Sequence, residues 1–199
     1  MKLSRIISII FHPVLMPMYA FFLALNFVPE FNSFFSPLQK IKFFKLIFGF
    51  TFLLPILGII ILRKLKFVSS YYMEHKEERR FPLLIAIGCY YFLLQIFERI
   101  YPDIILVKLL LGAMLILFVA AIISRFWKIS LHMLGVGGIV GAFFAIQQNF
   151  SSNIILFNSL IFCAGLVGFA RINENAHTLK QVYGGFLVGF CTECLIFYF

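Results

Sequence analysis

Two histidines in this chain lie where they could do chemistry on a phosphate. His177 follows Arg171 by six residues, and His132 follows Ser130 by two, each near the expected start of an apolar helix. An imidazole can attack phosphorus or protonate a leaving oxygen. A guanidinium, a hydroxyl and the backbone N–H groups of a helix start can hold the phosphate charge. The spacing therefore indicates phosphoryl transfer to a histidine.

A nucleophilic imidazole also needs a neighbour that fixes its far nitrogen. Gln181 lies one helical turn after His177 and Glu174 lies about one turn before it, so either side chain is within reach. Gln181 can accept a hydrogen bond but carries no charge, whereas Glu174 could also stabilise an imidazolium ion. We expect the catalytic set to be His177, His132, Gln181 and Glu174.

Several cations and one hydroxyl accompany the two histidine motifs along the chain. Any one of these cations alone is consistent with a loop charge at a membrane surface. Their convergence with two histidines favours a phosphate site instead. The candidate phosphate ligands are Arg171, Arg80, Arg79, Ser130, Lys128 and Lys76.

The composition decides what kind of elements must position these residues. Of the 199 residues, 62% are hydrophobic and 13% are charged, and the mean hydropathy is +1.01. Soluble domains are about 45–50% apolar and about 25% charged, so a water-soluble enzyme or nucleic-acid binder is excluded. The formal net charge of +9 then indicates basic loops beside a bilayer or a site for an anionic headgroup, with no nucleic-acid partner.

Apolar runs divide the chain into helices that could cross a bilayer, each of which needs about 20 residues. The predicted fold is an all-α polytopic membrane helix bundle of six to seven transmembrane helices, with seven preferred, in a single domain over residues 1–199. The first run contains His12 and Pro13, and we expect it to be kinked or interfacial at its start. The expected spans are Ile6–Val28, Phe43–Leu62, Phe81–Phe97, Ile104–Ile123, two spans within Ile129–Ala170 divided at Gln147–Asn153, and Val182–Phe199.

Small and polar residues in the last spans bear on packing and chemistry. Glycines at 135, 137, 138 and 141 in the fifth span and at 185 and 189 in the seventh predict close helix contact. Glu193 lies deep in the seventh span, where a carboxyl group needs a partner or a polar cavity. The four cysteines lie in apolar runs, and we expect them to be free thiols without a metal or redox role.

Counting spans sorts the loops to the two ends of the bundle. With seven spans, the N-terminus and segments 63–80, 124–130 and 171–181 share one end, which holds both motif histidines and most of the 17 Lys and Arg residues. The positive-inside rule turns that end to the cytoplasm. If the first run does not cross, the orientation reverses.

The order and spacing of the motifs resemble the type-2 phosphatidic acid phosphatase superfamily of integral membrane lipid-phosphate phosphatases. The resemblance covers roughly residues 74–189 and rests on Arg80-Phe-Pro82, Ser130-Leu-His132 and Arg171-x5-His177. It implies that His177 is the nucleophile and that His132 protonates the leaving group. It also implies a lipid phosphate or diphosphate as substrate, membrane lipids as the surroundings, and no metal or other cofactor.

The chain departs from the family pattern at several positions. Phe81 separates the arginine of the first motif from its proline, Leu131 replaces a glycine, and Gln181 stands where the family has an aspartate. Two alternatives therefore remain. One is a catalytically inactive member that binds or moves anionic lipids, and the other is a structural membrane protein. The sequence does not predict the oligomeric state.

Overall fold

The apolar runs form helices, because a chain in hydrocarbon must pair its backbone polar groups within itself. The computed structural model describes residues 3–68, 78, 80–100, 105–149 and 153–198, and every regular element in these ranges is helical. Within these ranges seven segments are long and apolar enough to cross a bilayer, which confirms the predicted all-α polytopic bundle and identifies an integral membrane protein. They are Leu3–Phe27, Pro37–Lys64, Arg80–Ile100, Ile105–Ile123, Leu131–Gln148, Ile154–Asn173 and Leu179–Tyr198.

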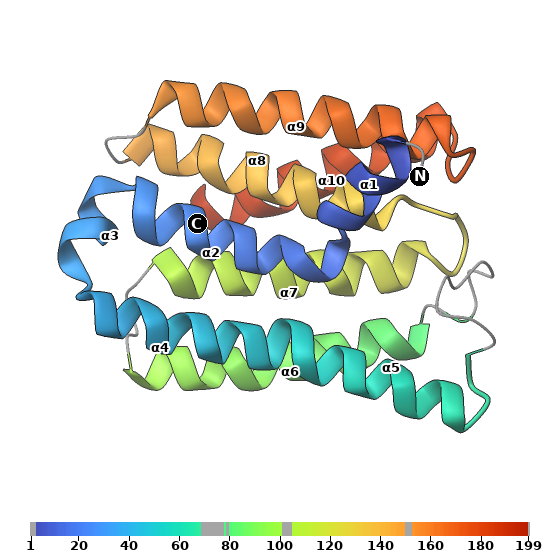
Figure 1. Cartoon of the computed structure of the whole chain (residues 1–199), viewed down its shortest axis with the longest axis horizontal. Coiled ribbons are helices and arrows are strands. Elements are labelled where there is room, and N and C mark those ends of the chain that lie inside the picture. Colours follow the sequence, from blue (N-terminus) through green and yellow to red (C-terminus); the bar gives the residue numbers. More distant parts are fainter. Residues whose placement is uncertain (1–2, 69–77, 79, 101–104, 150–152, 199) are drawn as a thin grey trace.

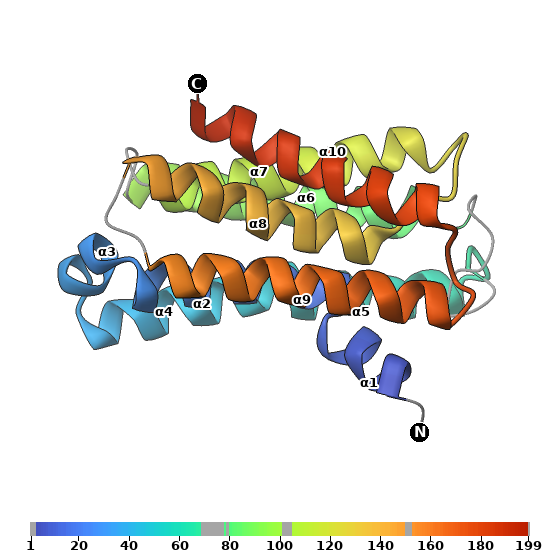
Figure 2. The same cartoon turned by 90° about the horizontal axis from the view of Figure 1, so that it is seen from above.

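The first span is broken, as its proline predicted. Helix α1 (Leu3–Ile10) ends before His12, a short 3-10 turn η1 (Pro13–Leu15) follows, and α2 (Met16–Phe27) then continues the span. Pro13 has no backbone N–H and cannot continue α1. The Nδ1 atom of His12 accepts a hydrogen bond from the Val14 N–H at 3.4 Å and caps the new turn. As a result α1 lies at an angle to α2 and packs against α9 (Ile154–Asn173) (Figures 1 and 2).

Helix α1 turns its polar side inward. Ser4 and Ser8 are 3% and 7% exposed, whereas Leu3 and Ile9 are 71% and 55% exposed. The two serines are four residues apart and therefore share one side of the helix. This is the arrangement expected of a helix that has lipid outside and a polar site inside.

The second span is continuous but irregular at its centre. After the short helix α3 (Pro29–Phe34), α4 (Pro37–Ile47) starts at a capping box between Ser36 and Gln39. A π-turn, η2 (Phe48–Leu53), then leads into α5 (Leu54–Lys64). The wider turn lies just before Pro55, which cannot donate to the preceding helical turn.

The most extensive helix contact joins α8 (Leu131–Asn149) to α10 (Leu179–Tyr198). A Cβ atom added at Gly185 would lie closest to the Ser130 carbonyl oxygen, and one added at Gly189 would lie closest to the Leu134 carbonyl oxygen. A step of four residues along α10 therefore matches a step of four residues in the same direction along α8, so the two helices run parallel. Glycines of α8 make the reciprocal approach, with Gly137 against the Phe186 carbonyl oxygen. The close helix packing predicted from these glycines is confirmed, and the structure shows that it joins the fifth span to the seventh.

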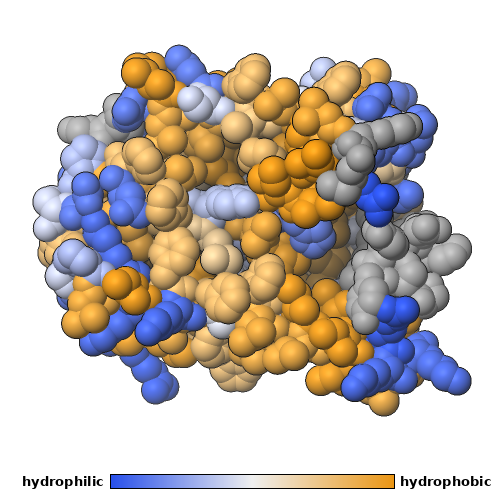
Figure 3. Space-filling view, in the orientation of Figure 1, coloured by the Kyte–Doolittle hydropathy of each residue, from blue (hydrophilic) through white to orange (hydrophobic). Residues whose placement is uncertain are grey.

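The remaining spans complete the bundle around this pair. Helices α6 (Arg80–Ile100) and α7 (Ile105–Ile123) pack on each other, α7 packs on both α8 and α10, and α5 packs on α6. The N-terminus and the α9–α10 turn lie at one end, and the C-terminus lies toward the other (Figure 1). On the face shown in Figure 3, the surface between the ends is mostly apolar, as a bilayer requires.

Replacement of Gly189 by alanine is expected to destabilise the bundle. The added Cβ would overlap the backbone of Leu134 and lie 2.8 Å from the Gly138 nitrogen, and neither group can turn away. Overpacking of this kind costs about 1–3 kcal/mol, which lowers Tm by about 2–4 °C per kcal/mol in a protein of this size. Thermal unfolding of the detergent-purified protein measures the change.

Gly165→Ala on α9 is the matched control, because a Cβ added at this position would have nothing within 4 Å. Its Tm should stay equal or rise slightly, since alanine favours the helix. Equal losses of Tm in the two variants would contradict a glycine-dependent contact between α8 and α10.

Candidate active site

A cavity of about 680 Å³ lies inside the bundle and reaches the end that carries the histidines. Its size is typical of sites for small organic ligands. Most of the wall is apolar and comes from α2, α5, α6, α7 and α8. The ionisable groups in the wall are His12, His132, Arg171, His177, Glu193 and the phenol of Tyr90.

The parallel contact of α8 and α10 brings the two motif histidines to this cavity. His132 is the second residue of α8, and His177 lies two residues before α10 begins. The backbone N–H of Ser130 donates to the carbonyl oxygen of Gln181 at 3.4 Å, which ties the two helix starts together. The predicted convergence of His132, His177 and Arg171 is therefore what the structure displays.

Gln181 orients His177, and a capping box orients Gln181. The Nδ1 atom of His177 donates to Gln181 Oε1 at 3.1 Å, and the Thr178 N–H donates to the same oxygen at 3.1 Å. In return the Gln181 N–H donates to Thr178 Oγ1 at 3.4 Å, which completes the box at the start of α10. Because two donors meet at one atom, that atom is the amide oxygen and Nδ1 carries the proton. The lone pair of His177 then lies on Nε2.

His132 is held from the other side of the cavity by α1. Its Nε2 atom contacts the Ser8 carbonyl oxygen at 3.1 Å, and a carbonyl can only accept, so Nε2 is the protonated nitrogen. The ring of His12 stands edge-on to the His132 ring, with centroids 5.6 Å apart. His12 therefore does two things, since it caps η1 and also lines the cavity.

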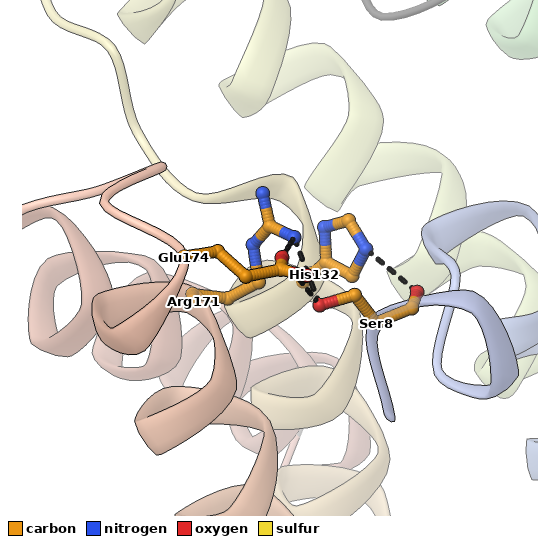
Figure 4. A network of polar contacts seen from close by, with 4 residues as sticks. All are labelled: Ser8, His132, Arg171 and Glu174. Atoms are coloured by element: carbon orange, nitrogen blue, oxygen red, sulfur yellow. Dashed lines mark hydrogen bonds and ion pairs between the residues drawn. The ribbon is translucent and has the colours of Figure 1, made fainter. Parts of the chain in front are cut away.

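Arg171 belongs to a polar network that crosses three helices (Figure 4). Its Nη1 atom donates to Glu174 Oε2 at 2.7 Å and to Ser8 Oγ at 2.9 Å, and Ser8 Oγ donates to Glu174 Oε2 at 2.9 Å. The guanidinium thereby reaches the cavity with a fixed orientation. Its Nε atom is buried and has no hydrogen-bond partner among the described residues. Arg171 thus retains a donor that no described protein atom uses, and the residue also lines the cavity.

The sequence suggested that Glu174 contacts His177, but in the structure Glu174 contacts Arg171 and Ser8. The amide of Gln181 is what contacts His177 Nδ1. Glu174 therefore acts on the guanidinium. The reason is the turn at the end of α9, where residue 174 follows Arg171 by three positions and faces the same side.

Ser130, Arg80 and Lys128 do not line the cavity. Ser130 is fully buried where α8 meets α10, and its hydroxyl has no partner within the described ranges. Arg80 is exposed, with its guanidinium carbon 4.5 Å from the centroid of the Phe81 ring. Lys128 is half-buried in the turn before α8. The phosphate-binding roles of these three residues stay predictions that the geometry does not support.

Two further predicted ligands, Lys76 and Arg79, lie outside the described residues. Ser8 is the functional candidate that the sequence analysis missed. A signal for it existed, because Ser4 and Ser8 are spaced to share one side of a helix that is apolar apart from these serines and Arg5.

The assembled groups suit an anion. The wall combines one guanidinium with three imidazoles at one end, and no cluster of three or more His, Cys, Asp or Glu side chains that could hold a metal is found within the described ranges. Cys191 and Cys194 are free thiols, and Cys194 donates to the Gly141 carbonyl oxygen at 3.4 Å. An oriented imidazole beside a second imidazole and a guanidinium can support attack on a phosphate ester.

No protein-family model, curated protein or solved structure matches this chain.

Ser8→Ala is expected to destabilise the protein by about 1–3 kcal/mol, because it removes hydrogen bonds to two charged groups and leaves them buried. Ser159→Ala is the matched control. Ser159 is exposed, and its hydroxyl donates to the carbonyl oxygen of Ile155 one turn earlier in its own helix. Thermal unfolding in detergent should show a lower Tm for Ser8→Ala than for the wild type. The Tm of Ser159→Ala should be almost equal to that of the wild type. Equal values would mean that the network does not hold α1 in place.

Proposed function

We propose that this protein hydrolyses a phosphate or diphosphate monoester of a membrane lipid through a histidine nucleophile. The observation that carries the proposal is the orientation of His177. Its Nδ1 proton is fixed by Gln181, and its ring shares one cavity with His132 and Arg171. We assign the protein to the cell membrane, which is the inner membrane if the source is bacterial.

In the proposed reaction His177 Nε2 attacks phosphorus and forms a nitrogen–phosphorus bond while the bond from phosphorus to the lipid oxygen breaks. The leaving oxygen takes a proton from His132, which must then enter the reaction as an imidazolium ion. Water attacks the phosphohistidine in the second step, giving its proton to the now neutral His132 and releasing phosphate. Arg171 offsets the negative charge on the phosphoryl oxygens in both steps.

The amphiphilic character of the cavity supports a lipid as the substrate. The ionisable groups lie mainly at one end of the cavity, and the rest of its wall is apolar. A phosphate held at the end of the bundle leaves the hydrocarbon part of the same molecule within the depth of the spans. Binding is then divided between charge recognition at the end and apolar contact inside.

A second candidate is a protein that binds lipid phosphate without turning it over. What favours it is the neutrality of Gln181, which orients the imidazole but cannot stabilise the imidazolium ion by charge. The pairing of Arg171 with Glu174 at 2.7 Å also reduces the net positive charge that an incoming phosphate meets.

His177→Ala is expected to lower the rate of phosphate release from a detergent-solubilised lipid phosphate by about 10³-fold or more, because the nucleophile is lost. Lys180→Ala is the control, since Lys180 is exposed in the first turn of α10, three residues after His177. Its rate should equal that of the wild type. Full activity in His177→Ala would exclude the histidine mechanism. Stabilisation of the wild type by vanadate without any phosphate release would instead select the second candidate.

Gln181→Glu tests the positioning residue. The substitution keeps the length of the side chain and its place in the capping box while adding a negative charge beside His177 Nδ1. We expect kcat to rise and KM to stay unchanged, because the charge stabilises the imidazolium character that develops in the transition state. Steady-state kinetics separate the two constants. An unchanged kcat would show that Gln181 serves only as a helix cap, and a fall in kcat would contradict the expected stabilisation by charge.

A further inference from the structure

Glu193 lies in the same cavity but plays no part in the reaction described above. It is 4% exposed, belongs to the transmembrane part of α10 and lines the cavity wall. Its Oε2 atom is buried and has no hydrogen-bond partner among the described residues. A carboxyl group in such surroundings is costly without a partner, and polar groups at membrane depth are usually functional.

A glycine on the neighbouring helix α7 makes room for this carboxyl group, and α8 packs beside it. Any side chain at Gly112 of α7 would overlap the Glu193 carboxylate, and a Cβ at Gly138 of α8 would lie 3.5 Å from Glu193 Cγ. The carboxyl group thus packs closely against α7. Glu193 also belongs to the cavity wall, so a ligand in the cavity can form a hydrogen bond with its carboxyl group.

The depth of Glu193 relates it to the phosphate end. Gly138, which lies beside Glu193, follows His132 by six residues on α8, and this corresponds to about 9 Å of helix rise. A ligand whose phosphate contacts His132 would place at Glu193 the atoms that lie a few covalent bonds from phosphorus. In a glycerolipid phosphate those atoms include the oxygens of the glycerol backbone and its ester groups. In an isoprenoid phosphate they are hydrocarbon.

We propose that Glu193 forms a hydrogen bond to the glycerol backbone or an ester group of a glycerolipid phosphate and so selects it over isoprenoid phosphates. A carboxyl group can accept a hydrogen bond from a hydroxyl group or, when protonated, donate one to an ester carbonyl. Sites built for such a hydrogen bond discriminate strongly against a ligand that lacks it, because the buried group is then left unpaired. This inference rests on the proposed binding of a lipid phosphate in the cavity.

The test compares two soluble probes, dioctanoyl phosphatidate and farnesyl monophosphate, by titration calorimetry on the protein purified in detergent. The wild type should bind the phosphatidate with at least about a tenfold lower Kd. Glu193→Leu should raise the Kd for phosphatidate about tenfold or more and leave that for farnesyl phosphate unchanged or lower. Glu193→Gln should keep most of the preference, because an amide still donates and accepts.

Two further variants separate recognition from packing. Gly112→Ala places a methyl group against the carboxylate without replacing it, and it should reduce the preference as Glu193→Leu does. Gly88→Ala is its control, because nothing lies within 4 Å of the added atom. Tm should be equal or higher in Glu193→Leu, since an unpaired buried carboxyl is removed. A lower Tm with an unchanged lipid preference would show a structural role and overturn the inference.

The binding readout also keeps this inference distinct from the proposed hydrolysis. Selective binding that depends on Glu193 without phosphate release would refute hydrolysis and support the recognition role. Hydrolysis of both lipids with the same kcat/KM in the wild type and in Glu193→Leu would refute only the recognition role. A loss of preference in Glu193→Gln as large as that in Glu193→Leu would refute hydrogen-bond recognition, because the carboxyl would then act through its charge or its proton.

Discussion

The close parallel contact between α8 and α10 is the constraint on which the candidate site depends. Lipid tails are as apolar as leucine, so membrane helices gain little from hiding apolar side chains and must gain from close packing instead. Here Gly185 and Gly189 let the backbone of α10 approach that of α8. Because the pair is parallel, both helices start at the same end. His132 and His177 therefore meet although a whole transmembrane helix separates them in the sequence.

The polar network at that end shows how a membrane protein keeps charge within the bilayer region. Arg171 is compensated by Glu174, and both are bonded to Ser8. A partly buried ion pair contributes to stability only when additional hydrogen bonds satisfy its members, and Ser8 supplies them. The break at Pro13 makes this possible, since α1 leaves the axis of α2 and lies over the end of α9.

The sequence predicted the bundle well because hydropathy and helix length are local properties. Seven spans, a break near Pro13 and close packing at the glycines of the fifth and seventh spans all follow from short stretches of chain, whereas the pairing of those two spans with each other came from the structure. The link between His177 and Gln181 was equally local, because one helical turn separates them. Ser8 was not predictable in the same way, since a serine in an apolar helix commonly bonds to its own backbone, as Ser159 does. Two features were not predictable, namely the exposure of Arg80 and the pairing of Glu174 with Arg171. Both depend on the direction in which a side chain points at the end of a helix, and sequence spacing alone does not determine that direction.

The inward polar side of α1 has a consequence for how the chain is assembled. Ser8 is made early, but its partners at 171 and 174 follow more than 160 positions later. At 5–20 residues per second, synthesis of the intervening chain takes roughly 10–30 seconds. Through that interval α1 carries serines with no protein partner and an outer side that is apolar apart from Arg5, a combination that suits the membrane surface better than its interior. Helix α1 therefore leaves the ribosome well before it can reach its final position, and its docking onto α9 completes the site.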